Sequence, residues 1–283
     1  MGKFSTALEK GEQEDSYTQE SNGDWLQPEK SEIQKQSSPN QPHPADLNIQ
    51  TISNPWDPRL FKAINQDISL PEIFKVLRSR ILHPQNSDRP IRSVMITSAV
   101  PKEGKSFITA NLGISLAQGM DQHSLLVDCD LRQPSLAKLF GISGTLGLVD
   151  YLRDNSPLPD LINKTAVNKL SIIASGKPPL NPAELLSSAK MKELARELSK
   201  RYDDRIIIFD TPPIMVAAES SVLASHVDGV ILVVREGMSR KNEIQKTIDS
   251  IGKNKILGMV YNGQTSNIID KSYSKRYDYY HHE

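Results

Sequence analysis

The sequence predicts an α/β protein built on a doubly wound, mostly parallel sheet. Short runs of β-branched and other apolar residues alternate with segments of helical periodicity, which is the order of β-α-β units. The apolar runs are nearly continuous, as in strands that helices cover on both faces. In such a sheet, ligands bind outside the carboxyl ends of the strands.

Six strands and five helices are expected. The expected strands are Ser93–Thr97, Ser124–Val127, Leu170–Ala174, Ile206–Phe209, Gly229–Val234 and Leu257–Tyr261. The expected connecting helices are Phe107–Gln118, Pro182–Lys200, Ser220–His226 and Arg240–Gly252. A further helix is expected over Leu70–Ile81, because Phe74, Leu77 and Ile81 form one apolar stripe and Pro71 suits a first turn.

Composition divides the chain into three parts. Residues 1–50 carry nine acidic against four basic residues and few branched apolar ones, too little apolar surface to offset the entropy of ordering. We therefore expect a disordered polar arm over 1–50, a folded domain over 51–263 and a polar tail over 264–283. The tail contains four tyrosines close together: Tyr273, Tyr277, Tyr279 and Tyr280.

Bulk properties exclude several classes of function. The chain is 37% hydrophobic and 24% charged, which is ordinary for a globular protein. Its formal net charge is zero, so no nucleic-acid partner is expected. Apolar runs such as Val230–Val234 are too short to cross a bilayer. The one cysteine, Cys129, rules out an internal disulfide and fits a reducing compartment, so we expect a cytoplasmic protein.

A phosphate-binding loop is predicted directly after the first expected strand. Residues 98–106 read Ser-Ala-Val-Pro-Lys-Glu-Gly-Lys-Ser and lead into a helical pattern, which indicates a P-loop NTPase-like fold. Backbone N–H groups in such a loop converge on phosphate oxygens, and the helix N-terminus favours negative charge. Lys105 would reach the β- and γ-phosphates, and the Ser106 hydroxyl would hold Mg²⁺. The alternative is an ordinary loop with Gly-Lys-Ser by chance.

Three carboxylates at strand ends complete the predicted MgATP site. Asp128 and Asp130 are two residues apart after the second strand and so point the same way. Cys129 between them should face the opposite way and pack. Asp210 follows four large apolar residues, the position of a Walker B aspartate that supports Mg²⁺ opposite Ser106. Solvated turn residues are the alternative for the first two aspartates.

With these motifs in place, the chain from about Trp56 to its C-terminus resembles the bacterial tyrosine kinase family, the autokinases that accompany polysaccharide polymerisation and export. The resemblance rests on the P-loop, the second Walker-like motif, the acid after the fourth strand, two short runs before and at the start of the helix expected from Pro182, and the tail. These are Ala99–Ser106, Val127–Arg132, Asp210-Thr211-Pro212-Pro213, Ser175-Gly176 with Asn181–Leu186, and Tyr273–Tyr280.

The resemblance implies an enzyme that uses ATP and Mg²⁺ to phosphorylate its own tail tyrosines, between subunits. It implies catalytic roles for Lys105, Asp128, Asp130 and Arg132, with Asp128 best placed to activate a tyrosine hydroxyl. Nucleotide contacts are implied for Pro101, Lys102, Glu103, Gly104, Lys105, Ser106, Phe107 and Asn262. Metal contacts are implied for Ser106, Asp130 and Asp210.

The resemblance also implies assembly and partners. Relatives carry a Glu-x-x-Arg-x-x-Arg helix used in ring assembly, and the matching residues here are Glu72, Lys75 and Arg78. Lysine at the middle position loses bidentate pairing. Relatives often have an aspartate nine positions after the Walker B acid, where this chain has Glu219. The implied partners are a separate membrane chain-length regulator or co-polymerase that activates the kinase at the inner face of the membrane, other protein-tyrosine substrates and a phosphotyrosine phosphatase.

Two other interpretations of the function remain open. Partition and cell-division-site ATPases share the P-loop, but their signature lysine would fall at Val100 here, and Lys102 lies two places further on. A nucleotide-binding scaffold without catalysis is the second, and the intact Lys105 and Asp128 argue against it. The tail could be aromatic by chance, and His281-His282 fits a solvated terminus better than a metal site.

Overall fold

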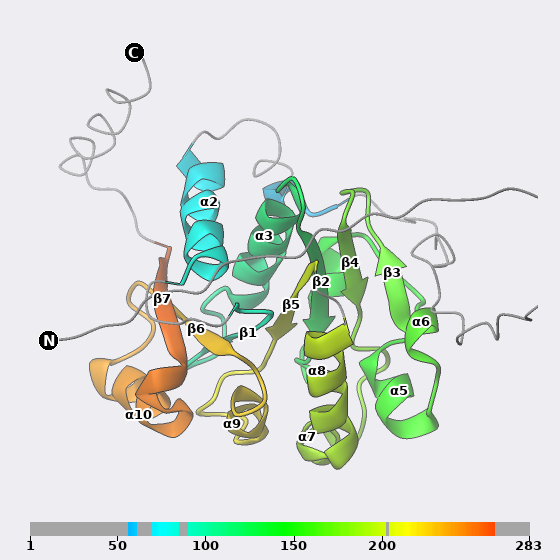
Figure 1. The fold of residues 1–283 in the computed structure, drawn as a ribbon. Helices are drawn as coiled ribbons and strands as arrows, with labels where there is room; N and C mark the ends of the chain where they lie inside the picture. The colour runs from blue at the N-terminus through cyan, green and yellow to red at the C-terminus, as the bar shows by residue number, and fades with distance from the viewer. Residues whose placement is uncertain (1–55, 61–68, 85–89, 202–203, 264–283) are drawn as a thin grey trace, which may run out of the picture. The chain divides into compact units, whose positions relative to one another are not determined.

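The computed structural model describes residues 56–60, 69–84, 90–201 and 204–263. Within these residues, seven strands form one sheet in the order β3-β4-β2-β5-β1-β6-β7 (Figure 1). All neighbours pair in parallel except β3 and β4, which are antiparallel. The strands are β1 Ser93–Ser98, β2 His123–Asp128, β3 Ile162–Lys164, β4 Leu170–Ile173, β5 Arg205–Asp210, β6 Gly229–Arg235 and β7 Ile256–Asn262.

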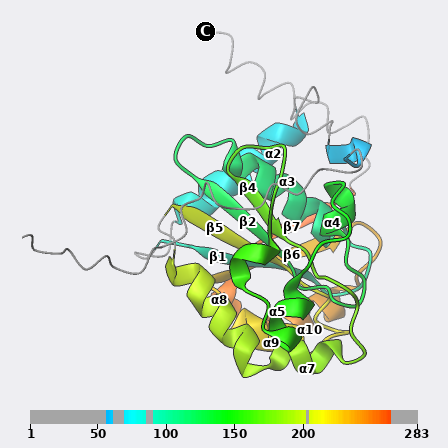
Figure 2. The ribbon, with the colours of Figure 1, turned by 90° about the vertical axis from the view of Figure 1, so that its right-hand side faces the viewer.

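Helices cover both faces of this sheet, which confirms the doubly wound class (Figure 2). One face carries α2 Ser69–Leu82, α3 Lys105–Ala117 and α4 Leu136–Leu139. The other carries α5 Leu148–Asp154, α6 Leu158–Leu161, α7 Pro182–Ser187, α8 Ala189–Arg201, α9 Glu219–Ala224 and α10 Lys241–Ile251, with a 3-10 turn, η2 Lys253–Lys255, before β7.

Each central strand supplies side chains to two separate hydrophobic cores. Ile207 and Phe209 pack under α8, whereas Ile206 and Ile208 pack under α3. Successive strand residues point to opposite faces, so a strand buried on both faces must be apolar at nearly every position. This is the physical reason why β1, β2, β4, β5 and β6 could be located from the sequence to within one residue at each end.

Three features of the fold depart from the sequence predictions. The short helices α4, α5 and α6 were not expected. The single helix expected over Pro182–Lys200 is wrong, because Ser188 is extended (ψ 153°) and separates α7 from α8. Its hydroxyl accepts a hydrogen bond from the backbone N–H of Met191 at 3.1 Å, in the manner of a helix N-cap. The short antiparallel strand β3 was not predicted, since three residues are too few to show a period.

The described residues begin at a buried aromatic contact. The rings of Trp56 and Phe140 meet edge to face with their centroids 4.9 Å apart, so the segment before α2 is anchored beside α4. Phe74 and Ile81 of α2 are buried as the predicted stripe requires. The predicted arm over 1–50 and the four tail tyrosines lie outside the described residues. No helix of the described part is long and apolar enough to span a membrane.

Candidate active site

The phosphate-binding loop joins β1 to α3 and is held in an unusual backbone conformation. Gly104 has a φ of 95°, and a Cβ there would lie 2.2 Å from the side-chain amide nitrogen of Asn262. Lys102, which is exposed, has a φ of 65°. A left-handed backbone costs a non-glycine residue about 1–2 kcal/mol, so Lys102 adds strain to the loop.

A buried carboxylate within this loop fixes its backbone through hydrogen bonds. Glu103 is fully buried, and its Oε2 accepts hydrogen bonds from the backbone N–H groups of Ala99 and Val100, both at 3.1 Å. Its Oε1 accepts from the backbone N–H of Arg235 at 3.0 Å and from the Ser239 hydroxyl at 2.8 Å. Glu103 therefore ties the loop to the segment that follows β6.

Asn262, at the end of β7, also contacts the loop. Its side-chain amide donates to the backbone carbonyl of Glu103 at 2.8 Å. The predicted nucleotide residue Asn262 thus lies against the P-loop, although the hydrogen bond is to the protein chain itself. The described residues end at Gly263, directly after Asn262 and therefore close to the phosphate-binding loop.

An ammonium, a hydroxyl and a carboxylate meet at the start of α3. Lys105 is only 7% exposed, and no residue of the described ranges accepts a hydrogen bond from its ammonium. Asp210 is fully buried: its Oδ1 accepts from the Thr109 hydroxyl at 3.3 Å, while its Oδ2 has no partner within the part that the structure describes. Burial raises the pKa of Asp210 to about 7, although the nearby Ser106 hydroxyl and Lys105 ammonium oppose this. Unpaired buried charges of both signs fit an anionic ligand with a cation beside it.

Asp128 is the register partner of Asp210 on the neighbouring strand, and it shapes the loop that follows β2. Its Oδ2 accepts from the backbone N–H groups of Ser135 and Leu136 at 3.1 and 3.0 Å, and its Oδ1 accepts from that of Asp130 at 3.2 Å. Burial raises the pKa of the Asp128 carboxyl well above its usual range, the charge of Asp210 adds to this, and the backbone donors partly offset it.

The remaining residues of this loop take distinct places. The Oδ1 of Asp130 accepts from the backbone N–H of Gln133 at 3.1 Å, and Asp130 is 8% exposed. Cys129 is fully buried in a hydrophobic core, as its place between two inward-facing aspartates predicts. Arg132 forms an ion pair with Glu219, the first residue of α9, which could not be predicted from the sequence.

Other predicted site residues lie at the loop or away from it. Pro101 is exposed in the phosphate loop and Phe107 is half-buried in the first turn of α3. On α2, the Glu72 carboxylate accepts from the Lys75 ammonium at 3.0 Å, with both side chains about half exposed. Arg78 donates from Nη1 to the backbone carbonyl of Ser115 at 2.7 Å, so it also fastens α2 to α3.

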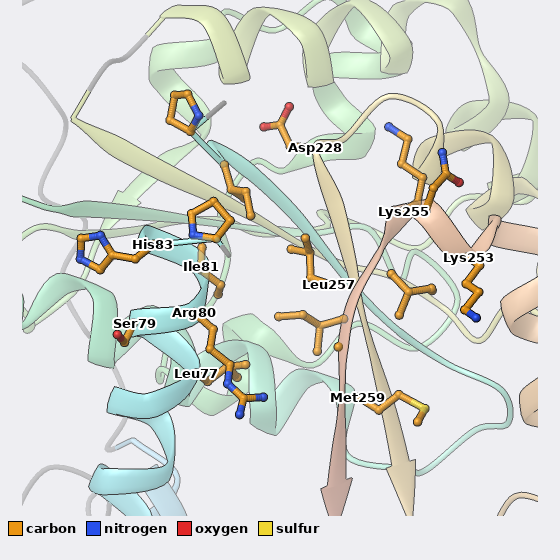
Figure 3. Close-up of a pocket in the computed structure, with 17 residues that line it drawn as sticks. Leu77, Ser79, Arg80, Ile81, His83, Asp228, Lys253, Lys255, Leu257 and Met259 are labelled. Carbon is orange, nitrogen blue, oxygen red and sulfur yellow. The ribbon is translucent and has the colours of Figure 1, made fainter. Parts of the chain in front are cut away.

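A separate pocket lies at the amino ends of the strands, away from the phosphate loop (Figure 3). Its cavity volume is about 1140 Å³, and Leu77, Arg80, Leu257 and Met259 are among the residues that line it. Asp228 and η2 immediately precede β6 and β7, so this pocket is at the amino ends of the strands. Parallel α/β sheets bind nucleotides at the carboxyl ends, where the phosphate loop is, and the two regions are therefore distinct.

Together, the doubly wound sheet, the phosphate loop and the buried carboxylates at its carboxyl edge define a P-loop nucleotide-binding protein. The chain is 40% identical over 195 residues to tyrosine-protein kinase YwqD of Bacillus subtilis, a match that covers 68% of this chain and 81% of that protein. It is 33% identical over 213 residues to the putative tyrosine-protein kinase CapB of Staphylococcus aureus, with coverage of 75% and 90%. The chain therefore belongs to the bacterial tyrosine kinase family and is a protein-tyrosine kinase.

Solved structures support the same assignment. The kinase domain of the Escherichia coli tyrosine kinase ETK matches with a TM-score of 0.67 and 29% identity, covering 78% of this chain and 85% of that one. The chimerical protein CapA2B2 matches with a TM-score of 0.66 and 30% identity, covering 78% and 96%. The septum site-determining protein MinD of Pyrococcus horikoshii matches at 24% identity with a TM-score of 0.51, which shows a shared fold alone. No family model matches the chain.

Proposed function

We propose that this kinase transfers the γ-phosphate of ATP to the tyrosines of its own tail, between subunits, and that this cycle regulates polysaccharide polymerisation and export. The observation that carries the proposal is the set of unpaired buried groups at one sheet edge. The Lys105 ammonium lacks an acceptor and Asp210 Oδ2 lacks a donor, both within the described residues. Such groups are costly unless a charged ligand completes them.

The residues present fit a magnesium–triphosphate ligand. The backbone of 101–106 and the Lys105 ammonium would bind the phosphates, with Phe107 and Asn262 at the edges of the nucleotide. Ser106, Asp130 and Asp210 would hold Mg²⁺, which would neutralise phosphate charge when bound. Oxygen ligands of this kind are those that Mg²⁺ prefers.

Asp128 is proposed to accept the tyrosine proton. A carboxylate has about four lone-pair sites, and backbone donors use three of those on Asp128, so one is left. The tyrosine oxygen forms a bond to the γ-phosphorus, the bond from that phosphorus to the ADP oxygen breaks, and the proton goes to Asp128. Catalysis then rests on positioning and charge stabilisation.

The tail is the proposed substrate. It follows β7, and Tyr273 lies eleven positions after Asn262, a reach of at most roughly 36–40 Å when extended. Lys271, Lys275 and Arg276 favour approach to a bound triphosphate. Each added phosphate brings about −1.5 to −2 charges, so several would reverse the sign of the tail and release it.

Mixing a chain that lacks activity with an active chain that lacks the tail tyrosines tests transfer between subunits. A full-length Lys105→Met chain is incubated with MgATP and an active chain that lacks residues 270–283, and phosphotyrosine is detected by blotting. Phosphate on the Lys105→Met chain is expected, because only its partner can place it there. Parent chain that labels its tail while the mixture shows no label would contradict transfer between subunits. ATP binding with no tyrosine label at all would favour the catalytically silent scaffold.

Assembly is proposed to use α2. The exposed Glu72 and Lys75 side chains are available to a second copy, whereas Arg78 is partly committed to Ser115. Changing Glu72 and Lys75 together to alanine should lower the sedimentation coefficient and tail labelling of the unphosphorylated protein. The matched control is the exposed pair Glu197 and Arg201 of α8, whose replacement should leave both unchanged. Unchanged sedimentation of the α2 variant would leave these charges as ordinary solvated residues.

The remaining partners are proposed from the family alone. They are a separate membrane chain-length regulator or co-polymerase, which would activate the kinase at the inner face of the membrane, other tyrosine substrates and a phosphotyrosine phosphatase. Coexpression with such a regulator should raise tail labelling of the parent chain but not of Lys105→Met.

A further inference from the structure

An ion pair connects the loop after β2 to the first residue of α9. Arg132 donates from Nη2 to Oε1 of Glu219 at 2.8 Å. The Glu219 side chain is 7% exposed and that of Arg132 is 40% exposed. A carboxylate buried to this degree requires a partner, and here the partner is a guanidinium that is itself partly exposed.

Glu219 is held in a fixed relation to the phosphate loop. The segment between β5 and α9 is fastened to β1, because the Thr211 hydroxyl donates to the carbonyl of Ile96 at 3.0 Å and the Ile214 N–H donates to that of Ser98 at 3.0 Å. The hydroxyl of Ser220 donates to the carbonyl of Pro212 at 3.2 Å. Since β1 leads directly into the phosphate loop, these bonds set where the Glu219 carboxylate lies.

The loop residues next to Arg132 are held by hydrogen bonds to two aspartates. Asp128 accepts from the N–H groups of Ser135 and Leu136, and Asp130 accepts from that of Gln133. The loop is thus shaped by the two aspartates of the proposed site. The Arg132 side chain bridges this loop to α9 through one of the five N–H donors of a guanidinium. No other described residue accepts from it, so four donors are left for an anion.

We infer that Glu219 is a positioning residue for the kinase reaction, which orients the Arg132 guanidinium so that its remaining donors face the transferring phosphoryl group. The inference rests on the proposed function. A guanidinium stabilises the negative charge of phosphoryl transfer only if it is already in place, and the buried carboxylate supplies that placement. Glu219 itself touches neither nucleotide nor tyrosine in this scheme.

A double-mutant cycle on phosphotyrosine formation tests whether Glu219 acts through Arg132. The four chains are the parent, Arg132→Ala, Glu219→Ala and the double variant, each assayed over a range of ATP concentrations. Arg132→Ala should lower kcat by about 100-fold. Glu219→Ala should lower kcat by about tenfold with the KM for ATP nearly unchanged. In the Arg132→Ala background, the same change should alter kcat less than about twofold.

Further variants separate positioning from structure. Glu219→Asp keeps the carboxylate and should recover most of the kcat that Glu219→Ala loses. If Glu219→Ala does not fold, Glu219→Gln, of nearly the same shape, takes its place in the cycle. The swap of Arg132→Glu with Glu219→Arg should restore thermal stability but not kcat. Glu197→Ala removes an exposed ion pair, also of 2.8 Å, and should leave kcat at the parent value.

The outcomes are distinguishable. A Glu219→Ala kcat within twofold of the parent, an equal loss in both backgrounds, or recovery of kcat in the swapped chain overturns the inference. A parent chain that labels no more tyrosine than Lys105→Met contradicts the proposed function itself, and the reaction on which the inference rests falls with it.

Discussion

Glu103→Gln should loosen the phosphate loop, although the new side chain has nearly the same shape and size as the glutamate. The carboxylate accepts two hydrogen bonds on each oxygen, from Ala99 and Val100 on one and from Arg235 and Ser239 on the other. A glutamine amide offers an acceptor oxygen on one side and an NH₂ group on the other. Because the Ser239 hydroxyl can turn to accept from the NH₂, the least costly arrangement leaves the Arg235 N–H without an acceptor.

The expected cost follows from these contacts. One unpaired N–H in a buried site costs about 1–3 kcal/mol, and the loss of charge weakens the remaining bonds by a further ~1 kcal/mol. We therefore expect the free energy of unfolding to fall by about 2–4 kcal/mol. For a folded part of this size, such a change lowers Tm by roughly 4–16 °C.

Thermal unfolding followed by circular dichroism measures the loss of stability. A titration with ATP measures how much the change in the phosphate loop weakens nucleotide binding. Glu103→Gln should bind ATP more weakly than the parent, because its backbone donors are no longer held in place. Glu197→Gln is the matched control, an exposed glutamate on α8 whose change should cost less than about 1 kcal/mol. A Glu103→Gln chain that melts within about 1 °C of the parent and binds ATP equally would refute the reasoning.

Three further substitutions have expected outcomes. Gly104→Ala should weaken ATP binding, because its Cβ would lie 2.2 Å from Asn262 Nδ2 and displace that amide from its hydrogen bond to the Glu103 carbonyl. Gly144→Ala, where φ is also positive (67°) but no atom lies within 4 Å, should cost only about 1–2 kcal/mol in chemical unfolding. Phe209→Ala should lower the free energy of unfolding by about 3–5 kcal/mol, since the ring is fully buried in the sheet core. Asp228→Ala should cost about 1–3 kcal/mol, as its Oδ2 accepts three hydrogen bonds at the start of β1, while Asp228→Asn keeps an acceptor and should melt near the parent.

Much of the fold could be predicted from the sequence, because most of its strands are buried on both faces. Such strands are continuous apolar runs, and five of the six predicted strands are of this kind, whereas every second residue of the edge strand β7 is exposed. The Gly-Lys-Ser triplet after the first run and Asp210 after the fourth are local signals of the same kind. Residue order alone places them at the carboxyl edge, since parallel strands end together.

Other features depended on contacts between distant parts of the chain. Glu103 was predicted as a residue of the phosphate loop. Its role in fastening that loop to the end of β6 depends on Arg235 and Ser239, which are more than 130 positions away in sequence. The pairing of Arg132 with Glu219 spans 87 positions, and the break at Ser188 interrupts a periodicity that continues on both sides. Periodicity reports which face of an element is buried. It carries no information about which polar groups meet across loops, because those pairs are set by how the loops pack once the sheet has formed.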